Sequence, residues 1–312
     1  MLKWLLGVPV VVMAALPAPL GSPVLHAAEG PTITVATYNV CKRTCGSGRY
    51  DWRHRRSAVV RSVAASGADV VAVQEAAGTV RQLARRLRPR GYALVTTATG
   101  GCGRGCTQDS FVFVRSSSVA PMGQGGTTLS AISGLAWSGT FDRGWSWSYL
   151  VHRASGTRFL VASVHLPNGK NSAMEQLRRA SAGGVVTTLR SNAAARGLAG
   201  IPTIIAGDLN SFSRRQPRGA QHVLKQAGFR DVHSAPDRRN AKVPTVNVTG
   251  RYRNPFPARP FRFRNPARLD YVMFDRGTPL HYEVFLRLRN GRFDDRYRGS
   301  DHNMVLGTVR LG

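Results

Sequence analysis

The amino-acid sequence predicts an α+β fold in which two mixed β-sheets pack face to face and the helices lie on the outside. Short apolar runs typical of buried strands recur along the chain, and only some of them are separated by stretches long enough for a helix. Several runs follow one another as hairpin-like neighbours. Because strands and helices do not alternate strictly, a single doubly wound parallel sheet is disfavoured.

The strand-like runs are rich in β-branched or aromatic residues and are bounded by turn residues. They lie at 33–38, 70–74, 92–96, 111–115, 145–149, 159–164, 201–206 and 268–273, with a last one after Asn303. The run at 145–149 alternates large aromatic and small residues, so we expect one aromatic face that packs in the core rather than against lipid. Helices are expected at 52–65, 79–87, 172–190 and 221–226.

The N-terminus has the features of a secretory signal peptide over residues 1–28. Lys3 is followed by an apolar stretch at 5–16, which is too short to span a bilayer, and then by small residues up to Ala28. Polar motifs near both ends of the remaining chain favour one domain, at 29–312. We therefore expect a secreted monomer without stable membrane insertion.

The four cysteines lie in two close pairs among Gly, Ser and Arg, as expected of loops. In an intracellular protein four thiolates are candidates for a zinc site, but export favours disulfides. Three connectivities are possible. We favour Cys41–Cys45 and Cys102–Cys106, because a short flexible loop closes at low entropic cost, with bridges between the two loops as the alternative.

The formal net charge is +28, and nearly all of the positive charge is arginine. Such a field attracts polyanions, and the arginine fork binds phosphate oxygens in pairs. A GC-rich coding bias also replaces lysine with arginine, but it does not explain the scarcity of Asp and Glu. The composition therefore indicates a polyanionic partner without deciding the fold.

Polar side chains stand where the strand-like runs end. Asn39, Glu75 and His165 each follow one run, and Asp208 with Asn210 follows another. Side chains alternate along a strand, so a carboxylate and an amide two residues apart point to the same side. Each residue alone suits a turn. Together with Asp270 and the segment 300–302, they predict one polar site that holds a water and a phosphate.

These motifs, in this order and with this spacing, resemble the endonuclease/exonuclease/phosphatase superfamily, which includes pancreatic deoxyribonuclease, apurinic endonucleases, inositol polyphosphate phosphatases and neutral sphingomyelinases. The resemblance covers residues 32–310 and rests on Thr37-Tyr38-Asn39, Gln74-Glu75, Val164-His165-Leu166, Gly207-Asp208-Leu209-Asn210, Leu269-Asp270-Tyr271 and Ser300-Asp301-His302. It implies a four-layer α/β/β/α sandwich with the strand ends gathered at one edge.

The resemblance also implies roles for these residues. Glu75 is expected to be the principal metal ligand, with Asn39 and Asp301 beside it. Hard oxygen ligands suit Mg²⁺, with Mn²⁺ or Ca²⁺ as alternatives, and the lack of cysteine in this set argues against zinc.

Asp208 and Asn210 are expected to orient the attacking water and a phosphate oxygen, and Asp270 to orient His302, which acts as a general base or binds phosphate. His165 resembles the second histidine of the deoxyribonuclease and inositol phosphatase branches. Arg115 resembles an arginine of the deoxyribonuclease branch.

The segment from Arg214 to Arg268 carries fourteen Lys or Arg and only two acidic residues. Within it, cations alternate with aromatic residues, so we expect Arg251, Arg253, Arg262 and Arg264 to bind substrate phosphates while rings stack on bases. The alternative is a solvated loop whose aromatic residues pack into the core.

The leading hypothesis is a secreted, divalent-metal-dependent nuclease that hydrolyses phosphodiester bonds of DNA, with RNA as a further substrate. The alternative is a secreted phospholipid phosphodiesterase of the sphingomyelinase type, or a phosphomonoesterase, of the same superfamily. A more remote alternative is a non-catalytic protein that binds polyanions.

Overall fold

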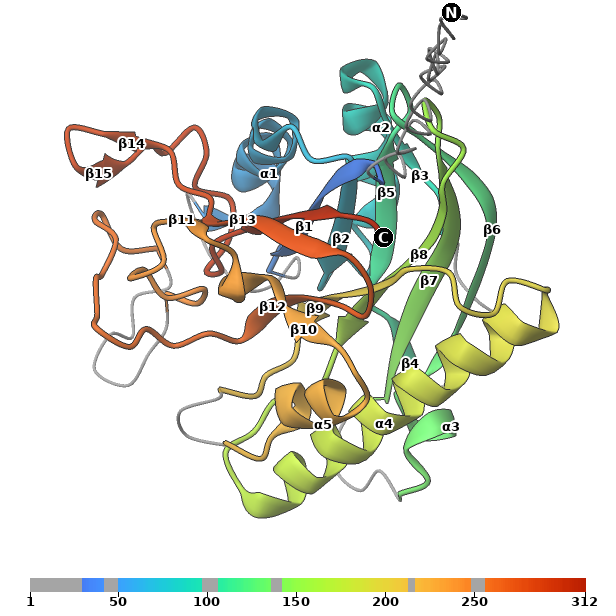
Figure 1. The fold of residues 1–312 in the computed structure, drawn as a ribbon. Coiled ribbons are helices and arrows are strands. Elements are labelled where there is room, and N and C mark those ends of the chain that lie inside the picture. Colours follow the sequence, from blue (N-terminus) through green and yellow to red (C-terminus); the bar gives the residue numbers. More distant parts are fainter. Residues whose placement is uncertain (1–29, 42–49, 97–105, 136–141, 213–216, 248–255) are drawn as a thin grey trace, which may run out of the picture.

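The computed structural model describes residues 30–41, 50–96, 106–135, 142–212, 217–247 and 256–312 (Figure 1). Within these residues the first sheet has seven strands, in the order β11 (Asp237–Arg239), β13 (Thr278–Val284), β16 (Val305–Arg310), β1 (Thr32–Asn39), β2 (Val70–Gln74), β5 (Phe111–Arg115) and β3 (Tyr92–Leu94). β1 and β2 are parallel, whereas β1 and β16 are antiparallel, so the sheet is mixed.

The second sheet packs against the first. Its order in the described chain is β10 (Arg230–Asp231), β12 (Asp270–Phe274), β9 (Thr203–Asp208), β8 (Arg158–His165), β7 (Asp142–His152) and β4 (Cys106–Gln108), with β6 (Val119–Thr128) also paired with β7. β8 and β9 are parallel and β9 and β12 are antiparallel. A separate hairpin joins β14 (Leu288–Arg289) to β15 (Arg292–Phe293).

The helices cover the outer faces of both sheets, which gives four layers (Figure 1). α1 (Trp52–Ser66) and α2 (Val80–Leu87) lie on the first sheet, and α3 (Leu129–Ser133), α4 (Ser172–Ala195) and α5 (Ala220–Gln226) lie on the second. Among the described residues, η2 (Arg88–Arg90) and η3 (Val232–Ser234) are short 3₁₀ helices. The predicted sandwich of two mixed sheets with helices outside is confirmed.

Three apolar layers hold this sandwich together. The central layer lies between the sheets and includes Ile33, Val70, Val161, Ile204 and Val272, all with no exposed surface. Burial of one such side chain stabilises the fold by about 1.5–3 kcal/mol. The outer layers pack helices on sheets. Trp145, Trp147 and Tyr149 belong to the layer under α4, which confirms that the aromatic face of this strand is core.

The predicted helices are found with small shifts at their ends. α4 begins where expected because the Asn171 side chain accepts a hydrogen bond from the backbone N of Met174, which caps the helix. It continues to Ala195, beyond the predicted end. The sequence did not predict β6, whose Gly-Gln-Gly-Gly segment has low strand propensity, because pairing with β7 rather than local preference makes it a strand.

Several predictions fall outside the described residues. The signal peptide, Cys45, Cys102, Arg251 and Arg253 all do. In the part of the chain that the structure describes, no cysteine is free and Cys41 is buried, but the pairing of the four cysteines stays a prediction. No helix among the described residues is both long and apolar enough to cross a bilayer.

Candidate active site

The side chains that point between the two sheets change from apolar to polar towards one end of the strands. On β1, Ile33 and Val35 belong to the central core, and the next two residues in the same phase are Thr37 and Asn39. The other strands follow the same pattern. Their polar inward positions at this end are His165 on β8, Asp208 on β9 and Asp270 on β12.

Strand register brings these positions together. Asp208 pairs with Asp270 across the antiparallel β9–β12 ladder and with His165 across the parallel β8–β9 ladder. Gly207 makes this approach possible, because a Cβ at this position would lie 1.9 Å from the backbone O of Val164. Close packing against the backbone of β8 therefore explains why the Gly-Asp-Leu-Asn motif begins with glycine. The strand ends gather at one edge, as predicted.

Glu75 reaches the site through its backbone conformation. Gln74 points between the sheets, where its Nε2 donates to Ser163 Oγ at 3.0 Å, so regular alternation would turn the next side chain outward. Glu75 instead has φ of 57°, in the left-handed region that residues other than glycine seldom adopt. Its carboxylate lies 3.2 Å from Asn39 Nδ2. An unfavourable backbone conformation at this position is typical of functional sites.

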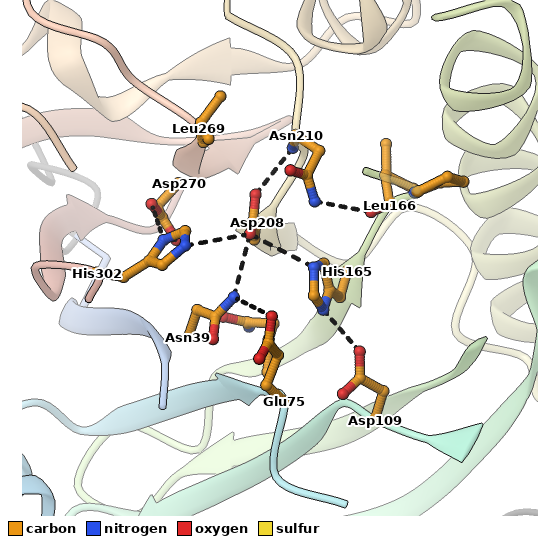
Figure 2. A network of polar contacts seen from close by, with 12 residues as sticks. Asn39, Glu75, Asp109, His165, Leu166, Asp208, Asn210, Leu269, Asp270 and His302 are labelled. Atoms are coloured by element: carbon orange, nitrogen blue, oxygen red, sulfur yellow. Dashed lines mark hydrogen bonds and ion pairs between the residues drawn. The ribbon is translucent and has the colours of Figure 1, made fainter. Parts of the chain in front are cut away.

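Asp208 is the centre of the polar network (Figure 2). Its Oδ2 accepts from Asn39 Nδ2 at 3.2 Å and lies 3.4 Å from His165 Nε2 and 3.8 Å from His302 Nε2. Its Oδ1 accepts from the backbone N of Asn210 at 2.9 Å. Only 1% of Asp208 is exposed, so these polar partners are what make a buried carboxylate tolerable.

Asp270 and His302 form the predicted acid–histidine pair. His302 Nδ1 lies 2.9 Å from Asp270 Oδ2, which leaves Nε2 facing Asp208. Burial raises the pKa of Asp270 to about 6, and the charge of Asp208 adds to this effect. Burial alone would lower the pKa of His302, but the charge and hydrogen bond of Asp270 outweigh it and raise that pKa well above its usual value. The Asp270 carboxylate therefore stabilises the protonated form of His302.

A second acid–histidine pair joins Asp109 to His165, and the sequence did not reveal it. His165 Nδ1 lies 2.6 Å from Asp109 Oδ2, so its Nε2 also faces Asp208 (Figure 2). Burial alone would raise the pKa of Asp109, but the charge and hydrogen bond of His165 and the charge of Arg143 outweigh it and lower that pKa. Two imidazoles, each held by its own carboxylate, converge on Asp208.

Arg143 places a cation at this second pair. Its Nη1 contacts the His165 ring and lies 3.3 Å from Asp109 Oδ2. Arg115, which was expected to bind substrate, lies elsewhere. β5 is antiparallel to β2 with Phe111 opposite Val73, so Arg115 stands at the opposite end of the sheet from Glu75, where it contacts the Tyr92 hydroxyl at 3.3 Å. The structure therefore does not bring Arg115 to the site, and Arg143 is the arginine found there.

Asn210 has its amide fixed by the backbone. Its Nδ2 donates to the carbonyl O of Leu166 at 2.9 Å, and its φ is 48°. An amide nitrogen has two hydrogens and the amide oxygen accepts, so the group is suited to contact a water or a phosphate oxygen as predicted.

The segments that carry Asn39 and Asp301 are tied together. Ser300 Oγ donates to the backbone O of Asn39 at 2.6 Å, and it lies 3.2 Å from Asp301 Oδ1. The buried Arg55, another residue that sequence reasoning missed, donates to the carbonyls of Val40 at 2.6 Å and Gly299 at 2.9 Å. These contacts hold the chain that follows β1, at Val40, next to the segment 299–301 that precedes β16.

The donor set at the site suits a hard cation. Glu75, Asp208 and Asp301 are carboxylates, and no described cysteine belongs to the group. Asp208, Asp270 and His302 offer one atom each within 4.8 Å of one another, a spacing compatible with an ion. Asn39 Oδ1 accepts from the backbone N of Cys41 at 2.9 Å, so in this geometry Asn39 presents its nitrogen to Glu75 and Asp208. Its role as a metal ligand stays a prediction.

The described part of the predicted basic segment divides between surface and core. Arg262 and Arg264 are exposed and line an open pocket. Phe256, by contrast, is 2% exposed and stacks on Tyr50 with ring centroids 4.1 Å apart. This phenylalanine is therefore part of the core and is not a platform for bases.

Comparisons with known proteins agree with this fold. A sequence model described as "Endonuclease/Exonuclease/phosphatase family" matches residues 36–302, and no curated protein matches the chain. A solved family protein from Bacteroides thetaiotaomicron has 20% identity and a TM-score of 0.67 over 91% of this chain and 99% of that chain.

Two further solved structures have the same fold. A mannosyl-6-phosphatase from B. thetaiotaomicron has 19% identity and a TM-score of 0.65 over 89% and 99% of the two chains. TDP2 from D. rerio, complexed with a single-strand DNA product, has 18% identity and a TM-score of 0.57 over 89% and 98%. At such identities the similarity shows the fold alone.

The family match, together with the four-layer sandwich and the carboxylate–histidine site at its edge, defines a hydrolase. The chain belongs to the endonuclease/exonuclease/phosphatase family, as the sequence motifs implied.

The Asp109–His165 pair allows a test with a matched control. We expect Asp109→Asn to lower the hydrolytic activity by at least about a hundredfold, because the charge that orients and stabilises His165 is removed. It should also lower the free energy of unfolding at neutral pH by about 2 kcal/mol, the typical contribution of a hydrogen bond to a charged group. Asp237 and His281 form a similar pair at 2.6 Å, but Asp237 is 71% exposed, so Asp237→Asn should change either quantity little.

The pH dependence follows from the lowered pKa of Asp109. A carboxyl with a depressed pKa in the folded state contributes stability above its unfolded pKa, about 3.9, and loses it as the pH falls through the folded pKa. Denaturant unfolding should therefore show a deficit for Asp109→Asn at neutral pH that shrinks in acid. A deficit of equal size at both pH values would contradict a charged Asp109.

Proposed function

We propose that this protein is a secreted, divalent-metal-dependent nuclease that hydrolyses phosphodiester bonds of DNA, with RNA as a further substrate. The observation that carries the proposal is the convergence of two acid–histidine pairs on Asp208, with Nε2 of His165 and His302 at 3.4 and 3.8 Å from the same oxygen. Hydrolysis of a diester needs one group to take a proton from water and another to give a proton to the leaving oxygen. The two imidazoles supply both.

The remaining residues position the reactants. Asp208 lies 3.4 Å from His165 Nε2 and 3.8 Å from His302 Nε2, and Asn210 is bonded to Asp208. These two residues would orient the water, which converts the attack into an effectively unimolecular step. Glu75, with Asp301 and Asn39 beside it, would hold Mg²⁺, which would neutralise phosphate charge and stabilise the departing oxygen. Arg143, beside His165, would bind a non-bridging phosphate oxygen and so take the substrate-binding role expected of Arg115.

The substrate class is inferred from charge. The net charge of +28 attracts polyanions, and Arg262 and Arg264 add exposed cations on the chain segment that leads to Asp270. A phosphomonoester or a lipid headgroup carries one phosphate, whereas a nucleic acid carries a row of them that such a surface can contact.

The proposal also includes export of the protein from the cell. The features of residues 1–28 support export, and export supports disulfides among Cys41, Cys45, Cys102 and Cys106. A monomer is proposed because the site is assembled within one chain.

A substrate panel tests this function. The protein without residues 1–28 is incubated with plasmid DNA, RNA, sphingomyelin and a sugar phosphate, each with Mg²⁺ or with EDTA. We expect cleavage of DNA in Mg²⁺ and none in EDTA, because charge neutralisation by the ion is lost. Hydrolysis of sphingomyelin or the sugar phosphate without cleavage of either nucleic acid would refute the nuclease and favour the alternative classes. Cleavage that persists in EDTA would refute metal dependence.

A further inference from the structure

A basic pocket with a volume of about 580 Å³ opens beside the connections that carry the catalytic groups. We call it the basic pocket. It is formed by three stretches of chain that are distant in sequence. The lining residues that carry charge are Arg238, Lys242, Arg262, Arg264 and Arg268, and His233 is also part of the lining.

Four cations of the basic pocket have no compensating charge. Arg238, Lys242, Arg262 and Arg264 are exposed, and within the described chain none of them forms an ion pair. Among the residues that the structure describes, no carboxylate lines the pocket. Four like charges around one concavity repel one another, so an anion that enters gains from all of them.

The other titratable groups of the basic pocket do not change this balance. Arg268 is neutralised by Asp231, with Nη2 at 2.6 Å from Oδ2 and both side chains 11% exposed. Burial, together with the charge of Arg268, lowers the pKa of His233 to about 4, so this histidine is neutral at pH 7. The excess positive charge therefore belongs to the four exposed cations.

The walls of the pocket are fixed to the catalytic site. Phe212 follows Asn210 by two residues, and Arg268 precedes Asp270 by two. The Thr245 hydroxyl accepts from the backbone N of Leu269 at 3.0 Å and of Asp270 at 3.2 Å. The backbone N of Phe263 donates to the carbonyl O of Lys242 at 2.8 Å, which joins the two basic stretches.

We propose that the basic pocket binds a backbone phosphate of the substrate strand other than the one that is cleaved. The proposal rests on the nuclease function and specifies its substrate as a strand that reaches both sites. Arginine forks bind phosphate oxygens without reading sequence, so this subsite positions the strand and contributes no base preference. A lipid headgroup or sugar phosphate has a single phosphate, which would occupy the catalytic site, so it carries no second phosphate that could bind in the basic pocket.

The test separates binding from hydrolysis. Binding of a fluorescein-labelled single-stranded DNA of about 12 nucleotides, within the usual range of such sites, is followed by anisotropy in EDTA over a salt series. The pocket variant is Arg238→Ala/Lys242→Ala/Arg262→Ala/Arg264→Ala. The control is Arg81→Ala/Arg85→Ala/Arg86→Ala/Arg90→Ala, which removes four exposed cations from α2 and η2 and the same total charge.

The pocket variant should bind roughly tenfold more weakly at low salt, with a salt slope smaller by about 0.7 for each phosphate no longer held. At about 0.15 M salt the control should change affinity by about twofold at most, because charges more than about 8 Å from the strand are then largely screened. Arg262→Ala/Arg264→Ala should show an intermediate loss, and all variants should keep the far-ultraviolet circular dichroism of the parent. Equal weakening of pocket and control variants, or no weakening of the pocket variant, would overturn the proposal.

Hydrolysis in Mg²⁺ is measured separately on the parent. If the parent binds the oligonucleotide through the basic pocket but does not cleave it, the nuclease function fails while the anion site stands. If the parent cleaves the oligonucleotide and the pocket variant binds it as tightly as the parent does, the nuclease function stands and the anion site fails.

Discussion

Alanine at His302 is expected to lower kcat for phosphodiester hydrolysis by roughly 10³–10⁴-fold, because it removes a proton-transfer group whose Nε2 faces Asp208. Alanine at Asp270 should cost nearly as much. The Asp270 carboxylate is 2.9 Å from His302 Nδ1, and its charge and hydrogen bond raise the pKa of this buried imidazole. Without it, His302 loses both its orientation and the group that stabilises its protonated form.

The double variant decides whether the two residues act as a unit. If Asp270 works only through His302, the loss in Asp270→Ala/His302→Ala should match that of His302→Ala alone. The measurement is kcat and KM for all four proteins on one DNA substrate at saturating Mg²⁺. Strictly additive losses would mean that Asp270 acts on the reaction by a separate route.

Glu75→Gln should abolish metal-dependent hydrolysis while leaving the fold and DNA binding nearly intact. The substitution keeps the size and the hydrogen-bonding oxygen that faces Asn39 but removes the charge expected to hold the ion. Glu283→Gln is the control, because its carboxylate is similarly placed next to a strand end but lies outside the site, with Arg239 and His281 as partners.

The two proteins are compared in a Mg²⁺ titration of cleavage, with unfolding and DNA binding in EDTA as checks. Near-normal turnover of Glu75→Gln at saturating Mg²⁺ would remove Glu75 from the metal site. Equal loss in Glu283→Gln would point to a general electrostatic effect instead.

The positions of the strand-end residues were predictable because alternation along a strand is a local rule. Asn39, His165 and Asp208 each end an apolar run, so their side chains share the phase of buried residues before them. The roles of Asp270 and His302 came from a fairly specific motif order. Glu75 was predicted by its place in that order, although its left-handed backbone, which turns it into the site, has no signature in the sequence.

Asp109, Arg143 and Arg115 show what the sequence could not decide. Asp109 follows β4, a strand of three residues that exists through its pairing with β7, so no apolar run marks it. Arg143 is one arginine among many, and only the fold places it against His165. Arg115 was expected to bind substrate, but β5 runs antiparallel to β2, so the end of β5 that carries Arg115 lies away from Glu75. The direction of β5 depends on its pairing with β2, which the local sequence does not determine.

Alternation along β9 places Asp208 between the sheets only when β9 pairs in its native register. Hydrolytic activity therefore also reports whether the strands have paired correctly. If β9 shifted by one residue against β8, the Asp208 side chain would point towards α4. Gly207 and Leu209 would then take the inward positions at the end of the strand. A chain misfolded in this way would retain two sheets and much of its secondary structure, and spectroscopy would scarcely distinguish it from the native protein. Its turnover would be nil, so specific activity per folded molecule measures the fraction of chains that reached the native register.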